Sequence, residues 1–217
     1  MRKVVEMTLQ VALDCNDIAS ALKVLDNIYP YLDVAELGTG LMISEGAGAV
    51  RELRKAYPEL VLLSDIKLMD GGAPLAQIVL EAGTDFVTVL GAADNNTIKG
   101  VTEIAHEYGK KSFVDLICVK DIERRSIEID ALGADCIGVH TSYDLRETVA
   151  APLEDLKILK QCVKNAKTSI SGGINLAVLA EILAAEPDNV IVGGSIMNAE
   201  NQRETAKALY EMIHSAE

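Results

Sequence analysis

Three charged side chains, Asp65, Lys67 and Asp70, follow the apolar run of residues 60–63. If this run forms a strand, Asp65 and Lys67 lie on one face, because side chains alternate along a strand. Opposite charges on one face of a core strand are costly unless they pair or bind something. A lysine held as an ammonium by carboxylates could stabilise negative charge on a substrate. A purely structural ion pair at the strand end is the alternative.

The elements that position these residues alternate regularly along the chain. Apolar β-like runs occur at residues 8–13, 33–37, 60–63, 86–90, 112–116, 136–139, 168–171 and 190–192. Helical patterns follow each run; we expect one from Asn16 or Asp17, one at 45–56 and one after Pro74. Repeated strand-plus-helix units imply parallel strands, so we predict a single α/β domain over residues 1–217, a closed (β/α)₈ barrel. An open doubly wound sheet is the competing fold, but Asp14-Cys15-Asn16 stands where its glycine fingerprint belongs.

Composition limits the classes of function. The chain has 217 residues, 4% aromatic, and a formal net charge of −13. An aliphatic core suits parallel strands covered by helices, whereas the negative charge argues against binding nucleic acid or anionic membranes. The sequence contains no apolar run of transmembrane length, no signal-peptide pattern and no C-x-x-C spacing among its four cysteines. We therefore expect a cytoplasmic protein with reduced thiols.

Polar residues mark the carboxyl ends of the predicted strands. They are Asp14, Glu36, Asp65, Lys67, Asp115 and His140. One such residue could simply mark where a strand meets water, but six around one barrel mouth form a candidate catalytic site. The carboxylates would repel one another unless a cation lay between them, and oxygen ligands suit Mg²⁺. We expect Glu36 and Asp65, on adjacent strands, to bind the metal.

The last two strand ends contain glycines instead of charges. Ser171-Gly172-Gly173 follows the seventh run and Gly193-Gly194 follows the eighth. These are the loops through which barrels commonly bind phosphate, using backbone N–H groups that glycine leaves accessible. The residues therefore predict a magnesium enzyme that acts on a small phosphorylated polyol or ketose.

The stretch from Asp65 to Asp70 also resembles the D-x-K-x-x-D signature of the orotidine 5′-monophosphate decarboxylase suprafamily. Within it, further motifs are most similar to the 3-hexulose-6-phosphate synthase family: Gln10-Val-Ala-Leu-Asp14, Glu36-Leu-Gly-Thr39, Val139-His-Thr-Ser-Tyr-Asp144 and Val192-Gly-Gly-Ser195. The resemblance implies a homodimer, Mg²⁺, and aldol addition of D-ribulose 5-phosphate to formaldehyde. It also implies that Asp70 reaches the neighbouring subunit's site.

The residue types suggest roles for the remaining members of the set. His140 is the best candidate base, because an unperturbed imidazole titrates near neutral pH. We expect Lys67 to supply a fixed positive charge, and Asp14 and Asp115 to hold substrate groups and orient that lysine.

Other activities of the same fold stay open at this point. The related 3-keto-L-gulonate 6-phosphate decarboxylases typically show H-R-S-R where this chain has His140-Thr-Ser-Tyr143, and orotidine decarboxylases use an Arg where Gly194 stands. A ribulose-phosphate 3-epimerase would need a second histidine on the rim. A Schiff-base aldolase would need Lys67 with a lowered pKa, which neighbouring carboxylates oppose. A non-catalytic sugar-phosphate binder is the remaining class.

Overall fold

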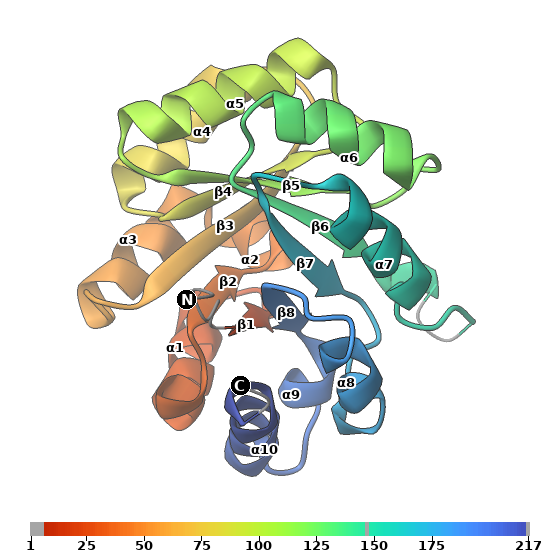
Figure 1. The fold of residues 1–217 in the computed structure, drawn as a ribbon. Helices are drawn as coiled ribbons and strands as arrows, with labels where there is room; N and C mark the ends of the chain where they lie inside the picture. The colour runs from red at the N-terminus through yellow and green to blue at the C-terminus, as the bar shows by residue number, and fades with distance from the viewer. Residues whose placement is uncertain (1–6, 146–147, 216–217) are drawn as a thin grey trace, which may run out of the picture.

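The computed structural model describes residues 7–145 and 148–215, and within them eight parallel strands form a closed barrel (Figure 1). Each strand pairs with its neighbours in chain order, and β8 pairs with β1. The strands are β1 (Thr8–Leu13), β2 (Val34–Leu37), β3 (Val61–Leu68), β4 (Phe86–Leu90), β5 (Lys111–Asp115), β6 (Cys136–His140), β7 (Lys167–Ser171) and β8 (Asn189–Val192). The predicted (β/α)₈ barrel is confirmed.

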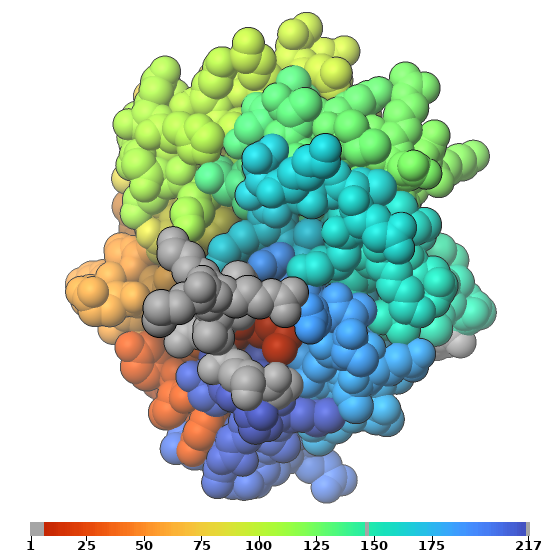
Figure 2. Space-filling model, in the orientation of Figure 1, coloured from red at the N-terminus to blue at the C-terminus, as the bar shows by residue number. Residues whose placement is uncertain are grey.

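Helices surround the strands in chain order (Figure 1), and α10 returns to pack against α1, so the first and last helices lie side by side on the surface (Figure 2). Side-chain caps begin several of them: Asp17 accepts the backbone N–H of Ser20, and Asn175 accepts that of Ala177. The helices are α1 (Ile18–Ile28), α2 (Thr39–Glu45), α3 (Ala47–Ala56), α4 (Gly72–Ala82), α5 (Asn95–Glu107), α6 (Ile122–Ala131), α7 (Leu153–Cys162), α8 (Leu176–Leu183), α9 (Gly194–Met197) and α10 (Gln202–His214), with short 3₁₀ turns at Tyr29–Tyr31 and Tyr143–Leu145.

Two helix predictions were wrong in detail. The helix expected at residues 45–56 is α3, which begins at Ala47, and a further helix that was not expected, α2, precedes it; Gly46, with φ 57° and ψ −148°, separates the two. The helix expected after Pro74 begins at Gly72 instead. Pro74 lies in the first turn, where its missing N–H costs no intrahelical hydrogen bond.

Strand β3 runs further than the apolar residues suggested. It continues through Asp65 and Lys67 to Leu68, and its register against β4 shifts between Ser64 and Leu68. Lys67 has φ 45° and donates its backbone N–H to Thr88 Oγ1 at 2.9 Å. This irregularity re-aims the end of the strand at the barrel mouth, as β-bulges commonly do beside active sites.

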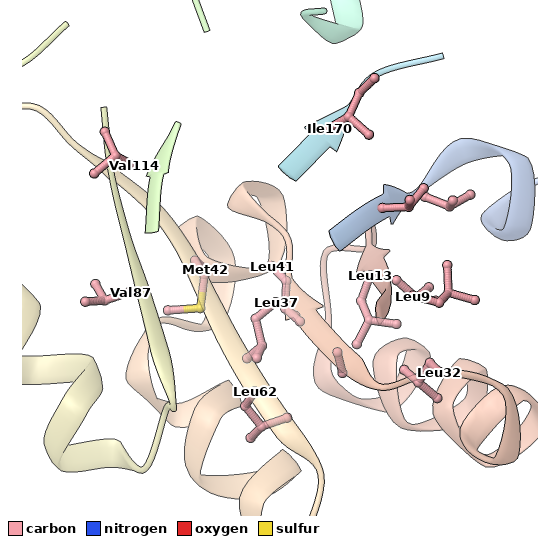
Figure 3. Close-up of a cluster of buried hydrophobic side chains, with 14 of the residues drawn as sticks. Leu9, Leu13, Leu32, Leu37, Leu41, Met42, Leu62, Val87, Val114 and Ile170 are labelled. Atoms are coloured by element: carbon pink, nitrogen blue, oxygen red, sulfur yellow. The ribbon is translucent and has the colours of Figure 1, made fainter. Parts of the chain in front are cut away.

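The main hydrophobic core lies between the outer faces of the strands and the helices. Leu9, Leu37, Leu41 and Leu62 are fully buried there (Figure 3). A smaller apolar cluster fills the barrel interior; it comprises Ala12, Val34, Leu63, Phe113, Cys136 and Ile191. Rigid strands packed on both faces therefore hold the polar side chains at their carboxyl ends.

None of the described helices is both long and apolar enough to cross a bilayer. The prediction that the chain has no signal peptide rests partly on Met1 to Glu6, and these six residues lie outside the described part of the structure.

Candidate active site

A cavity of about 990 Å³ opens at the carboxyl ends of the strands, and all eight strands contribute to its wall. It brings together eleven of the twelve predicted site residues: Asp14, Glu36, Asp65, Lys67, Asp115, His140, Ser171, Gly172, Gly173, Gly193 and Gly194. Asp70 is the exception, since it lies exposed beyond β3 and accepts the backbone N–H of Gly71 at 2.8 Å. Sequence positions spread over the whole chain thus converge on one space.

Lys67 lies at the centre of the charged groups. Its Nζ is 2.8 Å from Asp65 Oδ2 and 3.1 Å from Asp115 Oδ2. Burial acts to lower the pKa of the lysine, but the charges of Asp65 and Asp115 outweigh it and raise that pKa above its ordinary value. Lys67 is therefore a fixed ammonium, which is the wrong protonation state for forming a Schiff base.

Asp115 links the lysine to the histidine. The same Oδ2 atom that contacts Lys67 lies 2.9 Å from His140 Nδ1, and Oδ1 accepts the backbone N–H of Ile117. Burial acts to raise the pKa of Asp115, but the hydrogen bond and charge of His140, then Lys67, lower it below its ordinary value. The carboxylate stays ionised and fixes the imidazole ring, so Nε2 is the nitrogen available for proton transfer.

Glu36 and Asp65 are buried carboxylates on the adjacent strands β2 and β3. Glu36 Oε2 accepts a 2.6 Å hydrogen bond from Gln10 Nε2, while Asp65 accepts from the hydroxyls of Thr39 at 2.6 Å and Thr88 at 3.0 Å. Burial first, and then the charge of Asp65, raise the pKa of Glu36 well above its ordinary value. A cation bound beside Glu36 and Asp65 would offset the negative charge of these two buried carboxylates.

These donors fit Mg²⁺, which prefers oxygen ligands and often uses only one or two carboxylates plus waters and substrate oxygens. The described residues contain no cluster of three or more His, Cys, Asp or Glu side chains arranged to hold a metal. A site built on Glu36 and Asp65 therefore has the character of a magnesium site completed by substrate, and not of a closed structural site.

Asp14 occupies the mouth of the cavity between two glycines. A Cβ atom at Gly38 would lie 2.8 Å from Asp14 Oδ1, and one at Gly193 would lie 2.7 Å from Oδ2. Partial burial and then the charge of Asp65 raise the pKa of Asp14. Gly193 thus serves a packing purpose that the sequence alone did not indicate, in addition to its place in the predicted phosphate loop.

The glycine turn after β7 is a second close approach. Gly172 and Gly173 have φ 95° and 70°, and a Cβ at Gly172 would lie 2.3 Å from the carbonyl oxygen of Thr141. Ser195 Oγ donates to the carbonyl of Ile174 at 2.5 Å, which ties the loop after β7 to the loop after β8. The two predicted phosphate loops therefore form one continuous wall of the cavity.

Sequence reasoning missed three polar side chains of this site, Gln10, Thr39 and Thr88. Gln10 lies on the inward face of β1, in the same alternation as Ala12 and Asp14, so a polar residue on that face was the available signal. Thr88 is hidden within an apolar strand, and Thr39 follows a strand end. Their importance follows only from contact with Asp65 across neighbouring strands.

Comparison with known proteins decides the family. The sequence matches the model of the orotidine 5′-phosphate decarboxylase / HUMPS family over residues 7–209. The chain belongs to this family. The resemblance inferred from the Asp65-to-Asp70 signature is confirmed.

The relatives are similar over nearly their whole length. A 3-hexulose-6-phosphate synthase of Bacillus subtilis is 48% identical over 207 residues, which covers 95% of this chain and 99% of the relative. The crystal structure of 3-hexulose-6-phosphate synthase from Salmonella typhimurium has a TM-score of 0.95 at 34% identity and covers 97% of this chain and 100% of that chain. A 3-keto-L-gulonate-6-phosphate decarboxylase from Vibrio cholerae has a TM-score of 0.83 at 28% identity, covering 98% and 99%.

Proposed function

We propose that this protein, as a single catalytic domain, is a lyase that adds D-ribulose 5-phosphate to formaldehyde and forms D-arabino-3-hexulose 6-phosphate. The observation that supports this most strongly is the continuous chain of contacts Asp65–Lys67–Asp115–His140 inside the cavity. It combines a fixed positive charge with an oriented base, which an enediolate mechanism requires. The similarity to synthases from Bacillus subtilis and Salmonella typhimurium supports the same activity.

The reaction needs a carbon nucleophile at C1 of the ketose. His140 Nε2 removes the C1 proton, and Asp115 stabilises the imidazolium that results. The electron pair of the broken C–H bond gives a 1,2-enediolate, with negative charge on the C2 oxygen beside the Lys67 ammonium. C1 then attacks the carbon of formaldehyde, and the imidazolium returns its proton to the former aldehyde oxygen. The old C2 becomes the C3 ketone of the six-carbon product.

Glu36 and Asp65 would hold Mg²⁺ in this scheme. When bound, the ion would supply Lewis-acid stabilisation of the charge that develops on the substrate's C2 oxygen. Asp14 would hold a substrate hydroxyl at the cavity mouth. The loops containing Ser171, Gly172, Gly173, Gly193 and Gly194 would bind the phosphate, and that remote binding would fix C1 against His140.

The homodimer is part of the same proposal. Asp70 is exposed and does not line its own cavity, and the neighbouring helices α2 and α4 and the segment that follows β3 carry exposed apolar side chains: Ile43, Met69, Leu75 and Ile78. Apolar surface of this kind next to a site is typical of an interface. Asp70 would then complete the active site of the partner subunit.

Subunit exchange tests the shared site. We expect Asp70→Ala and Lys67→Ala proteins to be inactive alone. In the mixed dimer, one site has both lesions and the other has neither, so activity returns to about half of wild type per heterodimer. Exchange verified by mass, with no activity recovered, would contradict a shared site.

The decarboxylation of 3-keto-L-gulonate 6-phosphate is the second candidate, because it uses the same enediolate and a relative with that activity has the same fold. Tyr143 stands where the typical decarboxylase motif has an arginine, which favours the synthase. The test compares kcat/KM for the two reactions in one preparation, with and without chelation and re-addition of Mg²⁺. A higher kcat/KM for decarboxylation, full activity without metal, or trapping of Lys67 by borohydride would contradict the proposal. Binding of ribulose 5-phosphate without turnover would indicate a sugar-phosphate binder.

A further inference from the structure

A row of hydrogen-bonded polar side chains crosses the barrel interior and ends on Glu36. Thr8 Oγ1 donates to Asn189 Oδ1 at 2.8 Å, and Asn189 Nδ2 donates to Gln10 Oε1 at 2.9 Å. Gln10 Nε2 then donates to Glu36 Oε2 at 2.6 Å. Gln10 is 2% exposed and Asn189 7% exposed, so these are interior contacts. We call Thr8, Asn189 and Gln10 the Glu36 relay.

The relay has a direction. The Thr8 hydroxyl donates to the oxygen of the Asn189 amide, which turns the nitrogen of that amide toward Gln10. The nitrogen of Asn189 therefore meets the oxygen of Gln10, and the nitrogen of Gln10 is left facing Glu36. Each amide is fixed by the one before it, so the last donor always meets the carboxylate. Asn189 Nδ2 also donates to Ser169 Oγ at 3.0 Å, a branch that does not lead to Glu36.

The position of the relay explains why buried amides are retained there. The barrel interior also holds the apolar cluster that includes Leu63, Phe113 and Ile191. Buried amides are costly unless they are fully hydrogen-bonded. The row of hydrogen bonds ends at Glu36 Oε2, which leaves Oε1 of the same carboxylate for a ligand. Residues that hydrogen-bond a metal ligand orient it and tune its affinity.

We propose that Gln10, oriented by Asn189 and Thr8, is a positioning residue that holds the Glu36 carboxylate ready for a divalent cation. The inference rests on the proposed magnesium site at Glu36 and Asp65. It adds that affinity for the ion is set partly by Asn189, a residue that is not in the cavity wall formed by the described residues.

Metal affinity of the isolated protein tests the relay without any turnover. Dissociation constants for Mn²⁺ are measured by electron paramagnetic resonance, and those for Mg²⁺ by competition. Gln10→Leu should weaken Mg²⁺ binding about tenfold or more. Asn189→Asp offers only acceptors, so Gln10 must turn its nitrogen toward position 189 and its oxygen toward Glu36. This variant should weaken binding to a similar extent.

Two further variants distinguish a role of Gln10 in positioning Glu36 from nonspecific disruption of the barrel interior. Ser169→Ala removes the side branch and should leave the affinity unchanged. The double variant Gln10→Leu/Asn189→Asp should bind Mg²⁺ no more weakly than Gln10→Leu alone, because Asn189 acts through Gln10. The relay would be overturned if the double variant lost Mg²⁺ affinity by the product of the two single losses. Wild-type affinity in either folded single variant would overturn it as well.

The design also distinguishes failure of the relay from failure of the metal site. Wild-type protein that binds no Mg²⁺, or Glu36→Gln protein that binds it normally, would overturn the magnesium site itself. If a large substitution unfolds the protein, Thr8→Val removes one hydroxyl while keeping the side-chain volume. It should weaken Mg²⁺ binding by a few-fold, and an unchanged affinity in that folded variant would overturn the proposal.

Discussion

Four aspartates at the amino-terminal end of the barrel can be compared with the four carboxylates at its carboxyl end. The first set directly precedes the even-numbered strands, and each member accepts a backbone N–H from the preceding odd-numbered strand. The pairs are Asp33 with Leu9 (2.8 Å), Asp85 with Leu62 (2.9 Å), Asp135 with Ser112 (2.9 Å) and Asp188 with Thr168 (2.8 Å). The same contact thus recurs four times around the barrel.

Each of these aspartates also has its own basic neighbour. His214 contacts Asp33 and His106 contacts Asp135; Arg54 and Lys110 pair with Asp85, and Lys160 lies near Asp188. At the other end, Asp65 and Asp115 share the ammonium of Lys67, and Glu36 accepts a hydrogen bond from the neutral amide of Gln10. Carboxylates with separate partners stabilise the fold, whereas carboxylates crowded into one cavity retain capacity for a ligand.

The largest difference should come from two of the three aspartate-paired histidines, one at each end of the barrel. His140→Asn removes the proposed base, and we expect kcat to fall on the order of 10² to 10⁴ while phosphate binding persists. His106→Asn at the opposite end should leave kcat unchanged, since that histidine contacts Asp135 far from the cavity lining. Exchange of the C1 proton of ribulose 5-phosphate measures the step directly. Near-normal exchange in His140→Asn would exclude it as the base.

Removing an aspartate of the amino-terminal end should reduce stability and spare activity. Asp85→Ala removes the acceptor of the Leu62 N–H and the anionic partner of Arg54 and Lys110, and we expect the free energy of unfolding to drop by about 2–4 kcal/mol. Urea denaturation measures the loss, and kcat/KM should match wild type. An activity loss larger than the unfolded fraction accounts for would contradict the separation of the two ends.

The corresponding change at the carboxyl end should have the opposite sign. Burial and Asp65 raise the pKa of Glu36 to about 8, so above that pH Glu36→Gln removes one of two buried negative charges, and the metal-free protein should gain about 1 kcal/mol in unfolding free energy there. The same variant should lose Mg²⁺ binding and turnover. Asp188→Asn is the matched control at the other end and should lower stability. A less stable Glu36→Gln protein would show that this carboxylate contributes to the fold.

The smallest expected effect is on the pH dependence of stability, through Asp85. Burial acts to raise the pKa of Asp85, but Lys110, the Leu62 N–H and Arg54 lower it below its ordinary value. Such a group stabilises the fold fully above its unfolded pKa, about 3.9, and this stabilisation is lost as the pH falls through the lower folded value. The stability difference between wild type and Asp85→Ala should therefore be constant from pH 7 to 5 and shrink below about pH 4. A difference that grows on acidification would contradict the assignment.

The sequence alone determined the architecture and most of the site. Repeating strand and helix patterns predicted the barrel, because each parallel strand needs a crossover helix and eight such units close on themselves. Polar residues at strand ends predicted the cavity wall for the same reason: the carboxyl ends of parallel strands meet at one mouth. The additional helix α2 before Gly46 and the start of α4 at Gly72 were not predicted, since the backbone angles at helix ends depend on packing between neighbouring elements.

Only the tertiary structure decided which polar residues touch. The sequence could place Asp65 and Lys67 on one face, but contact between Lys67 and Asp115 depends on the register of three strands and on the irregularity at the end of β3. The direction of the amides from Thr8 to Gln10 likewise depends on β8 closing against β1, residues some 180 positions apart. Alternation along a strand is a local property that a sequence records, whereas contact across strands depends on distances that only the closed barrel sets.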